Sequence, residues 1–195
     1  MSADGARKTA VVTGAAGGIG RMLVLAALDA GYRVALLDRD GEGLDRVCAE
    51  VVEPNRRNCV LAYPTDVARE EDCVEAVKRA AADFGEISAL VNAAGIGMVV
   101  IRDSHMVEPV RFDEVSADHW DDFFAINTKA PFLMAKAVLP HLIESGWGRI
   151  INVTTSMDTM HLAGMYPYGP SKAALEAATA IWAQELNGTG VTVNV

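Results

Sequence analysis

Cysteine is scarce in this chain of 195 residues, and its spacing fits neither a metal site nor a disulfide framework. The three cysteines, Cys48, Cys59 and Cys73, are odd in number and form no C-x-x-C pair. We therefore expect reduced packing residues. The four histidines lack H-x-x-x-H spacing, so the sequence indicates no metal site.

Basic residues and long apolar runs are also in short supply. Lys and Arg total 17 against 26 Asp and Glu, which gives a net charge of −9, and no basic cluster interleaved with aromatic residues occurs. Nucleic acid is therefore not an expected partner. Because no uninterrupted apolar segment could cross a bilayer and no signal-peptide pattern opens the chain, we expect no membrane association and a cytoplasmic location.

Glycine, by contrast, is concentrated between an apolar strand at 9–13 and an apolar helix at 19–30. This segment contains Gly14, Gly17, Gly18 and Gly20. Glycines permit a tight turn, and the free N–H groups of the helix attract a pyrophosphate. The loop lacks the Lys-Ser/Thr ending of a P-loop, which disfavours ATP and GTP and leaves a dinucleotide. Both G-x-x-G-x-x-G and G-x-x-x-G-x-G fit, and the loop alone does not choose between them.

Strands and helices alternate along the rest of the chain. The patterns predict strands at 9–13, 33–38, 58–63, 87–92, 149–154 and 191–195, and helices at 19–30, 41–52, 69–84, 116–145 and 168–187. We expect the longest helix to bend near Pro131 or Pro140. Strands without polar alternation, separated by helices, indicate a Rossmann-type doubly wound parallel sheet in one α/β domain, 1–195.

The carboxyl edge of such a sheet is where ligands bind, and Asp38 ends the second predicted strand there. It follows Gly20 by 18 positions, close to where a carboxylate meets the adenosine ribose in dinucleotide folds. A carboxylate repels a 2′-phosphate and Gly17 offers no positive charge, so NAD is favoured; Arg39 is the one feature that allows NADP. The other interpretation is that Asp38 only caps the next helix.

A tyrosine and a lysine lie four residues apart in Tyr168-Gly-Pro-Ser-Lys172, at the start of the last predicted helix. This spacing places both side chains on one face. Tyrosine with its ordinary pKa near 10 is a poor base at neutral pH, and a neighbouring ammonium lowers that pKa. The pair is therefore suited to proton transfer, although the spacing alone also fits surface residues.

Taken together, these segments make the chain similar to the short-chain dehydrogenase/reductase family from Thr9 to the last residue. The shared motifs are Thr13-Gly14-x-x-x-Gly18-Ile19-Gly20, Asp66-Val67, Asn92-Ala93-Ala94-Gly95, Asn127 and Tyr168-x-x-x-Lys172. The resemblance assigns the glycine register to positions 14, 18 and 20.

The resemblance implies an NAD-dependent oxidoreductase, with NADP as the alternative cofactor, that interconverts a secondary alcohol and a ketone or aldehyde. Tyr168 is the implied general acid/base, Lys172 holds the nicotinamide ribose and lowers the tyrosine pKa, and Asn127 anchors a proton-relay water. The implied cofactor contacts are Gly14, Gly18, Ile19, Gly20, Asp38, Asp66, Val67, Asn92, Ala93, Gly95, Tyr168 and Lys172.

One departure from the family concerns the hydroxyl that polarises the substrate carbonyl after the fifth strand. Thr155 is at the family's position when residues are counted back from Tyr168 without a gap, and Ser156 has the usual chemistry one residue later. We favour Ser156 and keep Thr155 as a near-equal alternative. Segment 97–115 is longer than the family's usual connection and forms either an edge of the pocket or a solvated loop.

The alanine-rich helix at 168–187 allows close approach of another helix. Because family members pair this helix and the Asn127 helix across a two-fold axis, we expect a homodimer or homotetramer acting on a small alcohol or carbonyl compound. The sequence stops where the family continues into a further turn, a lid helix and a seventh strand, which predicts a truncated domain. The second interpretation is therefore a catalytically incomplete module that binds the dinucleotide and oligomerises.

Overall fold

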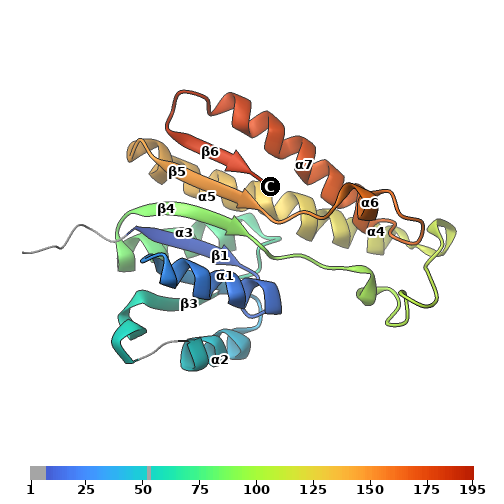
Figure 1. Ribbon diagram of the computed structural model, residues 1–195, viewed down its shortest axis with the longest axis horizontal. Coiled ribbons are helices and arrows are strands. Elements are labelled where there is room, and N and C mark those ends of the chain that lie inside the picture. The colour runs from blue at the N-terminus through green and yellow to red at the C-terminus, as the bar shows by residue number, and fades with distance from the viewer. Residues whose placement is uncertain (1–7, 52–53) are drawn as a thin grey trace, which may run out of the picture.

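A six-stranded parallel sheet forms the centre of the computed structural model, which describes residues 8–51 and 54–195 (Figure 1). Its strands are β1 (Thr9–Thr13), β2 (Arg33–Asp38), β3 (Val60–Pro64), β4 (Ile87–Asn92), β5 (Gly148–Asn152) and β6 (Val191–Asn194). Their order is β3-β2-β1-β4-β5-β6, and every neighbouring pair is parallel. The predicted Rossmann-type fold is confirmed, and the order reverses between β1 and β4, where such sheets bind ligands.

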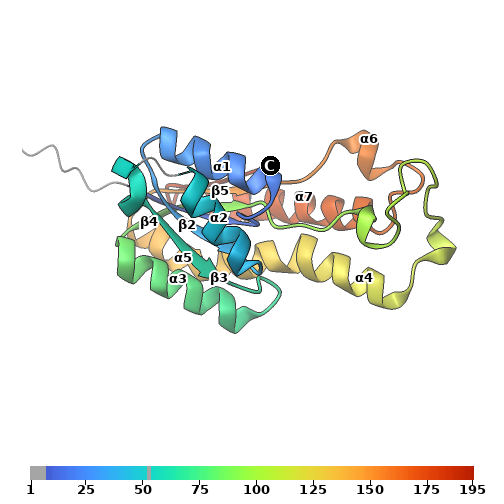
Figure 2. The same ribbon diagram turned by 90° about the horizontal axis from the view of Figure 1, so that it is seen from below.

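Helices cover both faces of the sheet. They are α1 (Gly18–Asp29), α2 (Gly41–Val51), α3 (Glu70–Phe84), α4 (Ala117–Phe124), α5 (Ala130–Glu144), α6 (Met157–Met160) and α7 (Tyr168–Glu185). Alternate residues of β1 point to opposite sides: Val11 packs in the core with α3 and α5, whereas Val12 packs in the core with α1 and α2. In Figure 2, α1 and α2 lie on one side of the sheet and α3 and α5 on the other.

The longest predicted helix is interrupted, but ahead of the two prolines expected to bend it. A π-helical segment, Ala125–Lys129, separates α4 from α5, and Pro131 lies in the first turn of α5 while Pro140 lies inside it. Pro131 has no N–H to donate to the carbonyl of Asn127 four residues earlier, so the regular helical pattern cannot pass through this point. The irregularity therefore centres on Asn127, and π segments are frequent at functional sites.

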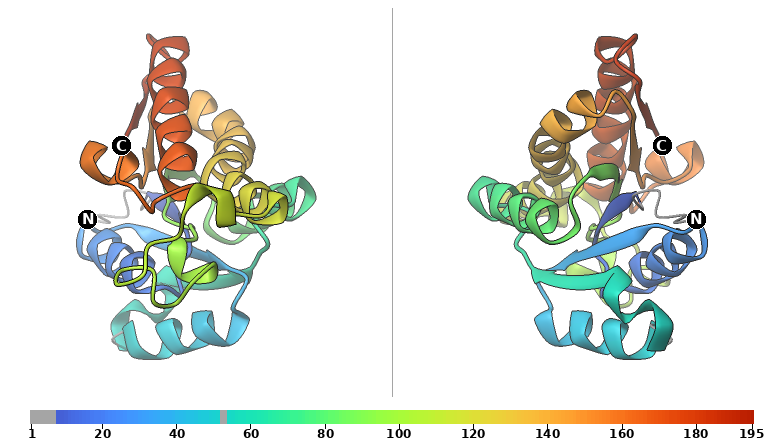
Figure 3. Two further views of the ribbon diagram at one scale, coloured as in Figure 1. Left: turned by 90° about the vertical axis from the view of Figure 1, so that its right-hand side faces the viewer. Right: turned by 90° about the vertical axis from the view of Figure 1, so that its left-hand side faces the viewer.

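Two connections extend beyond the carboxyl edge of the sheet. One runs from β4 to α4 and the other from β5 through α6 to α7 (Figure 1). Figure 3 (left) looks onto this end of the molecule, where segment 97–115 faces the viewer. Among the residues described, no helix combines the length and apolar character that crossing a membrane requires.

Candidate functional site

A cavity of about 400 Å³ lies at the carboxyl ends of β1 to β4. Its lining consists of Gly14, Gly17, Gly18, Ile19, Gly20, Asp38, Arg39, Thr65, Asp66, Val67, Ala93, Ala94, Gly95, Ile96 and Ile126. The volume lies in the range of small-ligand sites. Nine of the predicted cofactor contacts share this one cavity, although they come from the ends of four different strands.

The loop between β1 and α1 shapes one wall of this cavity. Gly14 has φ of +66°, and a Cβ there would be 2.8 Å from the Cα of Ala94. A Cβ on Gly20 would overlap the carbonyl oxygen of Gly14, whereas a Cβ on Gly18 would meet no atom within 4 Å. Gly14 and Gly20 are therefore required by the protein's own packing, and Gly18 is required only if something else occupies the open space.

The backbone of this loop fits a pyrophosphate. Gly17 is the N-cap of α1 and no side chain caps that helix, so the first N–H groups of α1 are available beside the cavity. Thr13 Oγ1 accepts hydrogen bonds from the N–H groups of Ala93 and Ala94, both at 3.1 Å, which ties the end of β1 to the turn after β4. The two loops that face the cavity are thus held together.

Carboxylates occupy the side of the cavity formed by β2 and β3. Asp38 Oδ2 accepts a hydrogen bond from the N–H of Ala16 at 3.1 Å, and its Oδ1 accepts one from Asp40 at 3.0 Å. Asp38 therefore both supports the glycine loop and lines the cavity. Asp66 also lines it, and within the described residues Arg39 is the one cationic side chain in the lining.

Lys172 lies at the inner end of the site, in α7, and is only 5% exposed. Its Nζ donates a hydrogen bond to the carbonyl oxygen of Val153 at 2.8 Å. Burial lowers the pKa of the Lys172 ammonium to about 8. A Cβ on Gly95 would be 3.3 Å from Lys172 Nζ and 3.2 Å from Asn127 Oδ1, so Gly95 joins the cavity to these two side chains.

Asn127 is fully buried and bonds two segments, the turn after β4 and the start of α7. Its Oδ1 accepts from the N–H of Ile96 at 2.9 Å, and its Nδ2 donates to the carbonyl of Ile96 at 3.0 Å and to Ser171 Oγ at 3.0 Å. Ser171 Oγ in turn donates to the carbonyl of Tyr168 at 2.7 Å. Asn127 thus connects the turn after β4 to the helix that carries Tyr168 and Lys172.

The two candidate hydroxyls after β5 differ in their hydrogen bonds. Ser156 is exposed and is the N-cap of α6, where its Oγ accepts from the N–H of Thr159 at 3.2 Å and lies 3.0 Å from Thr159 Oγ1. Thr155 is half-buried, and its hydroxyl makes no hydrogen bond with any described residue. Neither residue lines the cavity, and nor do Asn127, Tyr168 and Lys172.

The side chain of Asn92 contacts β5 and α5 and does not line the cavity. Its Nδ2 donates to Asn152 Oδ1 at 2.9 Å and to the carbonyl of Pro131 at 3.3 Å, and Asn152 Nδ2 donates to Thr179 Oγ1 at 2.8 Å. Within the described residues, Asn92 Oδ1 has no hydrogen-bond partner. The side chain of Asn92, a predicted cofactor contact, is thus turned toward β5 and α5.

Comparison with known proteins decides the family. The family model described as short chain dehydrogenase matches residues 8–195. The chain belongs to this family. A D-threitol dehydrogenase of Mycolicibacterium smegmatis is 33% identical over 187 residues, which cover 96% of this chain and 67% of that relative.

Solved structures of the short-chain dehydrogenase family agree with the fold and carry both nicotinamide dinucleotides. A 3-ketoacyl-(acyl-carrier-protein) reductase from Brucella melitensis complexed with NADH matches with a TM-score of 0.84 and 28% identity, over 95% of this chain and 73% of that one. A metagenomic short-chain oxidoreductase in complex with NADP matches with 0.83 and 29%, over 94% and 78%. A nicotinamide dinucleotide is therefore supported for a short-chain dehydrogenase of this kind.

Some lining and supporting residues were not on the predicted list. Thr13 and Ser171 stand inside the quoted motifs, so their position beside Gly14 and Lys172 was a usable signal. Thr65 and Ile126 line the cavity without any motif, and only the strand end and the π segment place them there. The carbonyl of Val153 is a backbone partner, which no sequence pattern reveals.

Proposed function

We propose that the chain is an NAD(H)-dependent oxidoreductase that interconverts a secondary alcohol and a ketone or aldehyde, with Tyr168 as the general acid/base. The observation that carries this proposal is the junction at Gly95, which lines the cavity on one side and lies next to Lys172 Nζ and Asn127 Oδ1 on the other. The glycine loop and the carboxyl edge of the sheet supply the nucleotide side, and the start of α7 supplies the proton-transfer side.

The cavity favours NAD over NADP. The pyrophosphate fits the glycine loop and the first N–H groups of α1, and the adenosine ribose fits the side that Asp38 lines. The lining contains two carboxylates and one arginine, which disfavours an additional phosphate dianion. When bound, the dinucleotide supplies or accepts the hydride.

The protein's own residues handle the proton. Tyr168 Oη takes the proton of the alcohol on oxidation and returns it to the carbonyl oxygen on reduction. Lys172, whose buried ammonium has a pKa near 8, lies one helical turn after Tyr168 and stabilises negative charge there. Asn127 holds the turn after β4 in place through its two bonds to Ile96 and anchors a relay water.

Thr155 is proposed as the hydroxyl that donates to the carbonyl oxygen, in preference to Ser156. The Ser156 hydroxyl is already used to cap α6, whereas the Thr155 hydroxyl is uncommitted among the described residues. Thr155→Val should lower kcat by a factor of about 100, the scale reported for one oxyanion donor. Ser156→Ala should lower it less than threefold, and the reverse ranking would assign the role to Ser156.

The decisive experiment measures turnover and binding in the same samples. The protein is assayed with NADH and a panel of ketones, and NADH binding is followed by fluorescence. Tyr168→Phe should keep NADH affinity within about twofold and lose general acid/base catalysis, which amounts to about 10² to 10⁴ in kcat. Binding of NADH without turnover of any ketone by the unaltered protein would contradict the oxidoreductase proposal and favour a binding module.

A homodimer or homotetramer is proposed through the face formed by α5 and α7. Phe132 and Trp182 lie side by side there, with ring centroids 6.4 Å apart, and border an apolar hollow of about 180 Å³. Phe132 and Ile181 are each about half exposed. Sedimentation velocity over a hundredfold range of concentration tests this; a monomer throughout would contradict it. The cytoplasmic location stays a prediction from the sequence.

A further inference from the structure

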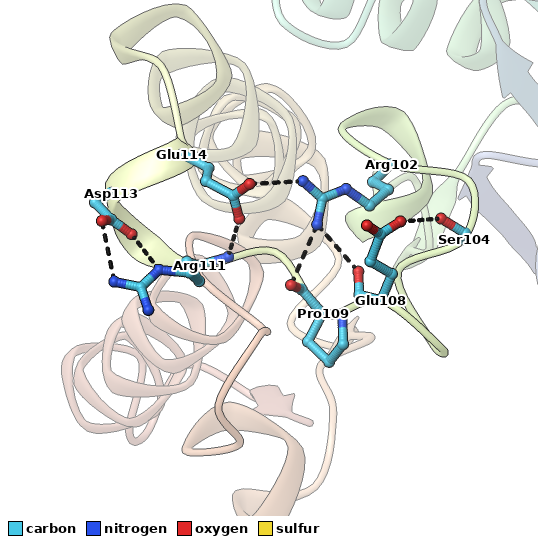
Figure 4. Close-up of polar contacts among 7 residues, drawn as sticks. All are labelled: Arg102, Ser104, Glu108, Pro109, Arg111, Asp113 and Glu114. Carbon is cyan, nitrogen blue, oxygen red and sulfur yellow. Dashed lines mark hydrogen bonds and ion pairs between the residues drawn. The ribbon is translucent and has the colours of Figure 1, made fainter.

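Segment 97–115 is held together by one arginine (Figure 4). Arg102 Nη1 donates to the carbonyl oxygens of Glu108 and Pro109 at 3.2 and 3.3 Å, and its Nη2 donates to Glu114 Oε1 at 2.8 Å. Glu114 Oε2 accepts from the backbone N–H of Arg111 at 2.8 Å. Because a guanidinium offers several donors in a rigid plane, a single side chain fixes three separate points of the loop.

These bonds determine where Val110 lies. Val110 stands between the anchored residues Pro109 and Arg111, is 1% exposed and packs with Met98 and Phe123. The ring of Phe123 meets the ring of Tyr168 edge to face, with centroids 6.5 Å apart and an interplanar angle of 81°. Arg102 therefore supports the apolar surroundings of the proposed general acid/base.

A second contact joins the same loop to the segment that leads into α7. Gly164 has φ of +86°, and a Cβ there would be 2.7 Å from the Cβ of Pro109. Pro109 is one of the residues whose carbonyl Arg102 holds. The loop is thus packed against the connection between β5 and Tyr168, and the two together form a wall beside that residue.

The wall is apolar and its cations are already paired. Four partly exposed apolar side chains pack with Tyr168 on the buried Met98, Val110 and Phe123, namely Ile96, Ile101, Val115 and Met165. Arg111 Nε and Nη2 donate to the carboxylate of Asp113 at 2.9 and 3.1 Å, so both arginines of segment 97–115 have a carboxylate partner. The segment has four acidic residues and two arginines, which disfavours an anionic substrate.

We propose that Arg102 is a positioning residue that holds segment 97–115 as part of a preformed wall of the substrate pocket, and that this wall selects substrates with an apolar, uncharged body. The inference rests on the proposed oxidoreductase function. A polyol would place hydroxyl groups against Ile96, Ile101, Val115 and Met165, which offer no hydrogen bonds, and an acyl group on an anionic carrier would meet the surplus carboxylates of segment 97–115.

Two arginines of the same loop provide a matched pair of variants. Arg102→Met removes the three-point anchor, whereas Arg111→Met removes a charge of equal size whose side-chain bonds reach only Asp113. Each variant is assayed with 2-octanol and threitol in the presence of NAD, and with acetoacetyl-coenzyme A in the presence of NADH. NADH affinity and the unfolding temperature serve as checks of the fold.

The unaltered protein should favour 2-octanol over threitol by at least tenfold in kcat/KM. Arg102→Met should lower kcat/KM for 2-octanol about tenfold, mainly by raising KM, and change the threitol value less than threefold. Arg111→Met should stay within twofold for all substrates. Equal effects of the two variants, or a preference of the unaltered protein for threitol or the coenzyme A thioester, would overturn the inference.

Failure of the oxidoreductase function gives a different pattern, namely no turnover of any substrate. The wall is then tested by binding, with octanamide added to the NADH complex and NADH fluorescence as the signal. Loss of octanamide binding in Arg102→Met but not in Arg111→Met supports the wall, and equal binding overturns it. If Arg102→Met does not fold, Glu114→Gln weakens one of the three anchors and should raise KM for 2-octanol about threefold.

Discussion

The cavity beside the glycine loop and the surroundings of Tyr168 lie at the same edge of the sheet, yet they are built from different parts of the chain. Backbone atoms and missing side chains form one wall of the cavity: Gly14 and Gly20 let backbone segments approach closely, and Gly18 leaves open space where a Cβ would stand. Buried polar side chains form the other region. Asn127 donates a hydrogen bond to Ser171, and Lys172 donates one to the carbonyl of Val153.

The two regions should be sensitive to different kinds of substitution. The glycine loop that forms one wall of the cavity has no room for a Cβ at Gly14 or Gly20, so a single added methyl group there disturbs it sterically. The region of Tyr168 depends on bonds between residues 31 and 44 positions apart, so it is sensitive to the loss of a partner. Substitutions that add atoms should damage the first region, and substitutions that remove polar atoms should damage the second.

Gly20→Ala should have the largest effect on the cavity region. Its Cβ would overlap the carbonyl oxygen of Gly14, and backbone on both sides would have to shift. We expect a loss of about 3 kcal/mol in the free energy of unfolding, the scale of overpacking in a filled interior, and no measurable NADH binding. Urea unfolding and NADH fluorescence measure the two effects.

Gly18→Ala is the matched control for this substitution. A Cβ at Gly18 meets no atom within 4 Å, so the free energy of unfolding should change by less than about 0.5 kcal/mol. NADH affinity should still fall at least tenfold, because Gly18 lines the cavity. If both alanine variants were equally stable, the steric account of the glycine register would be wrong.

The glycine register also shows what the sequence could predict. Strands β1, β2 and β4 match the predicted limits, because buried runs bounded by Gly, Asp or Asn leave little choice of ends. Nine of the fifteen residues that line the cavity are predicted cofactor contacts. Because a glycine loop and the ends of buried strands depend on contiguous residues, most of the cavity side of the site could be predicted from the sequence.

Long-range partners were not predictable in the same way. The amide of Asn92, a predicted cofactor contact, bonds Asn152, and no sequence pattern reveals that pairing because it exists only when β4 and β5 align. Ser156 has suitable chemistry, but in the structure its hydroxyl caps α6, and the sequence did not predict that short helix. The irregularity at Asn127 arises from the proline four residues later, whose effect reaches back along the helix.

Lys172→Met should have the next largest effect, and it should stabilise the fold while abolishing function. Burial lowers the pKa of Lys172 from its ordinary 10.5 to about 8, which at 1.36 kcal/mol per unit costs the folded protein about 3 kcal/mol near pH 7. Losing the bond to Val153 offsets about 1 kcal/mol. The variant should therefore be about 2 kcal/mol more stable at pH 7 by urea unfolding, with kcat reduced at least 100-fold.

The pH dependence gives the sign of this effect independently. Between pH 8 and 10.5 the unfolded chain holds the Lys172 proton and the folded protein does not, so Lys172 contributes a rise in stability with pH across that window. Below pH 8 the burial cost is fully present. The stability advantage of Lys172→Met should shrink as pH rises from 8 to 10; an advantage that is constant or grows would contradict the burial of a charged lysine.

Asp38→Asn should change cofactor choice by a smaller amount. The amide keeps an oxygen for the N–H of Ala16 but removes the negative charge that faces the ribose side of the cavity. The ratio of NADPH to NADH affinity should rise about tenfold, or about 1.4 kcal/mol, aided by Arg39. Asp66→Asn is the control, because its carboxylate lines the same cavity; a similar shift there would argue against a specific role of Asp38.

Two buried hydroxyls on α7 offer the smallest and most selective comparison. Ser171 Oγ accepts from Asn127, and Thr179 Oγ1 accepts from Asn152 at 2.8 Å while donating to the carbonyl of Leu175. Each substitution, Ser171→Ala or Thr179→Val, leaves a buried amide donor with one bond fewer. Both should cost about 1 kcal/mol in the free energy of unfolding, measured with urea.

Their effects on catalysis should separate. Ser171 Oγ also donates to the carbonyl of Tyr168, so Ser171→Ala loosens the link between Asn127 and the start of α7 and should lower kcat about tenfold with little change in KM for NADH. Thr179 binds the sheet network, and Thr179→Val should leave kcat within twofold. Equal losses of kcat in Ser171→Ala and Thr179→Val would contradict this separation, because a general loosening of α7 would then explain both losses.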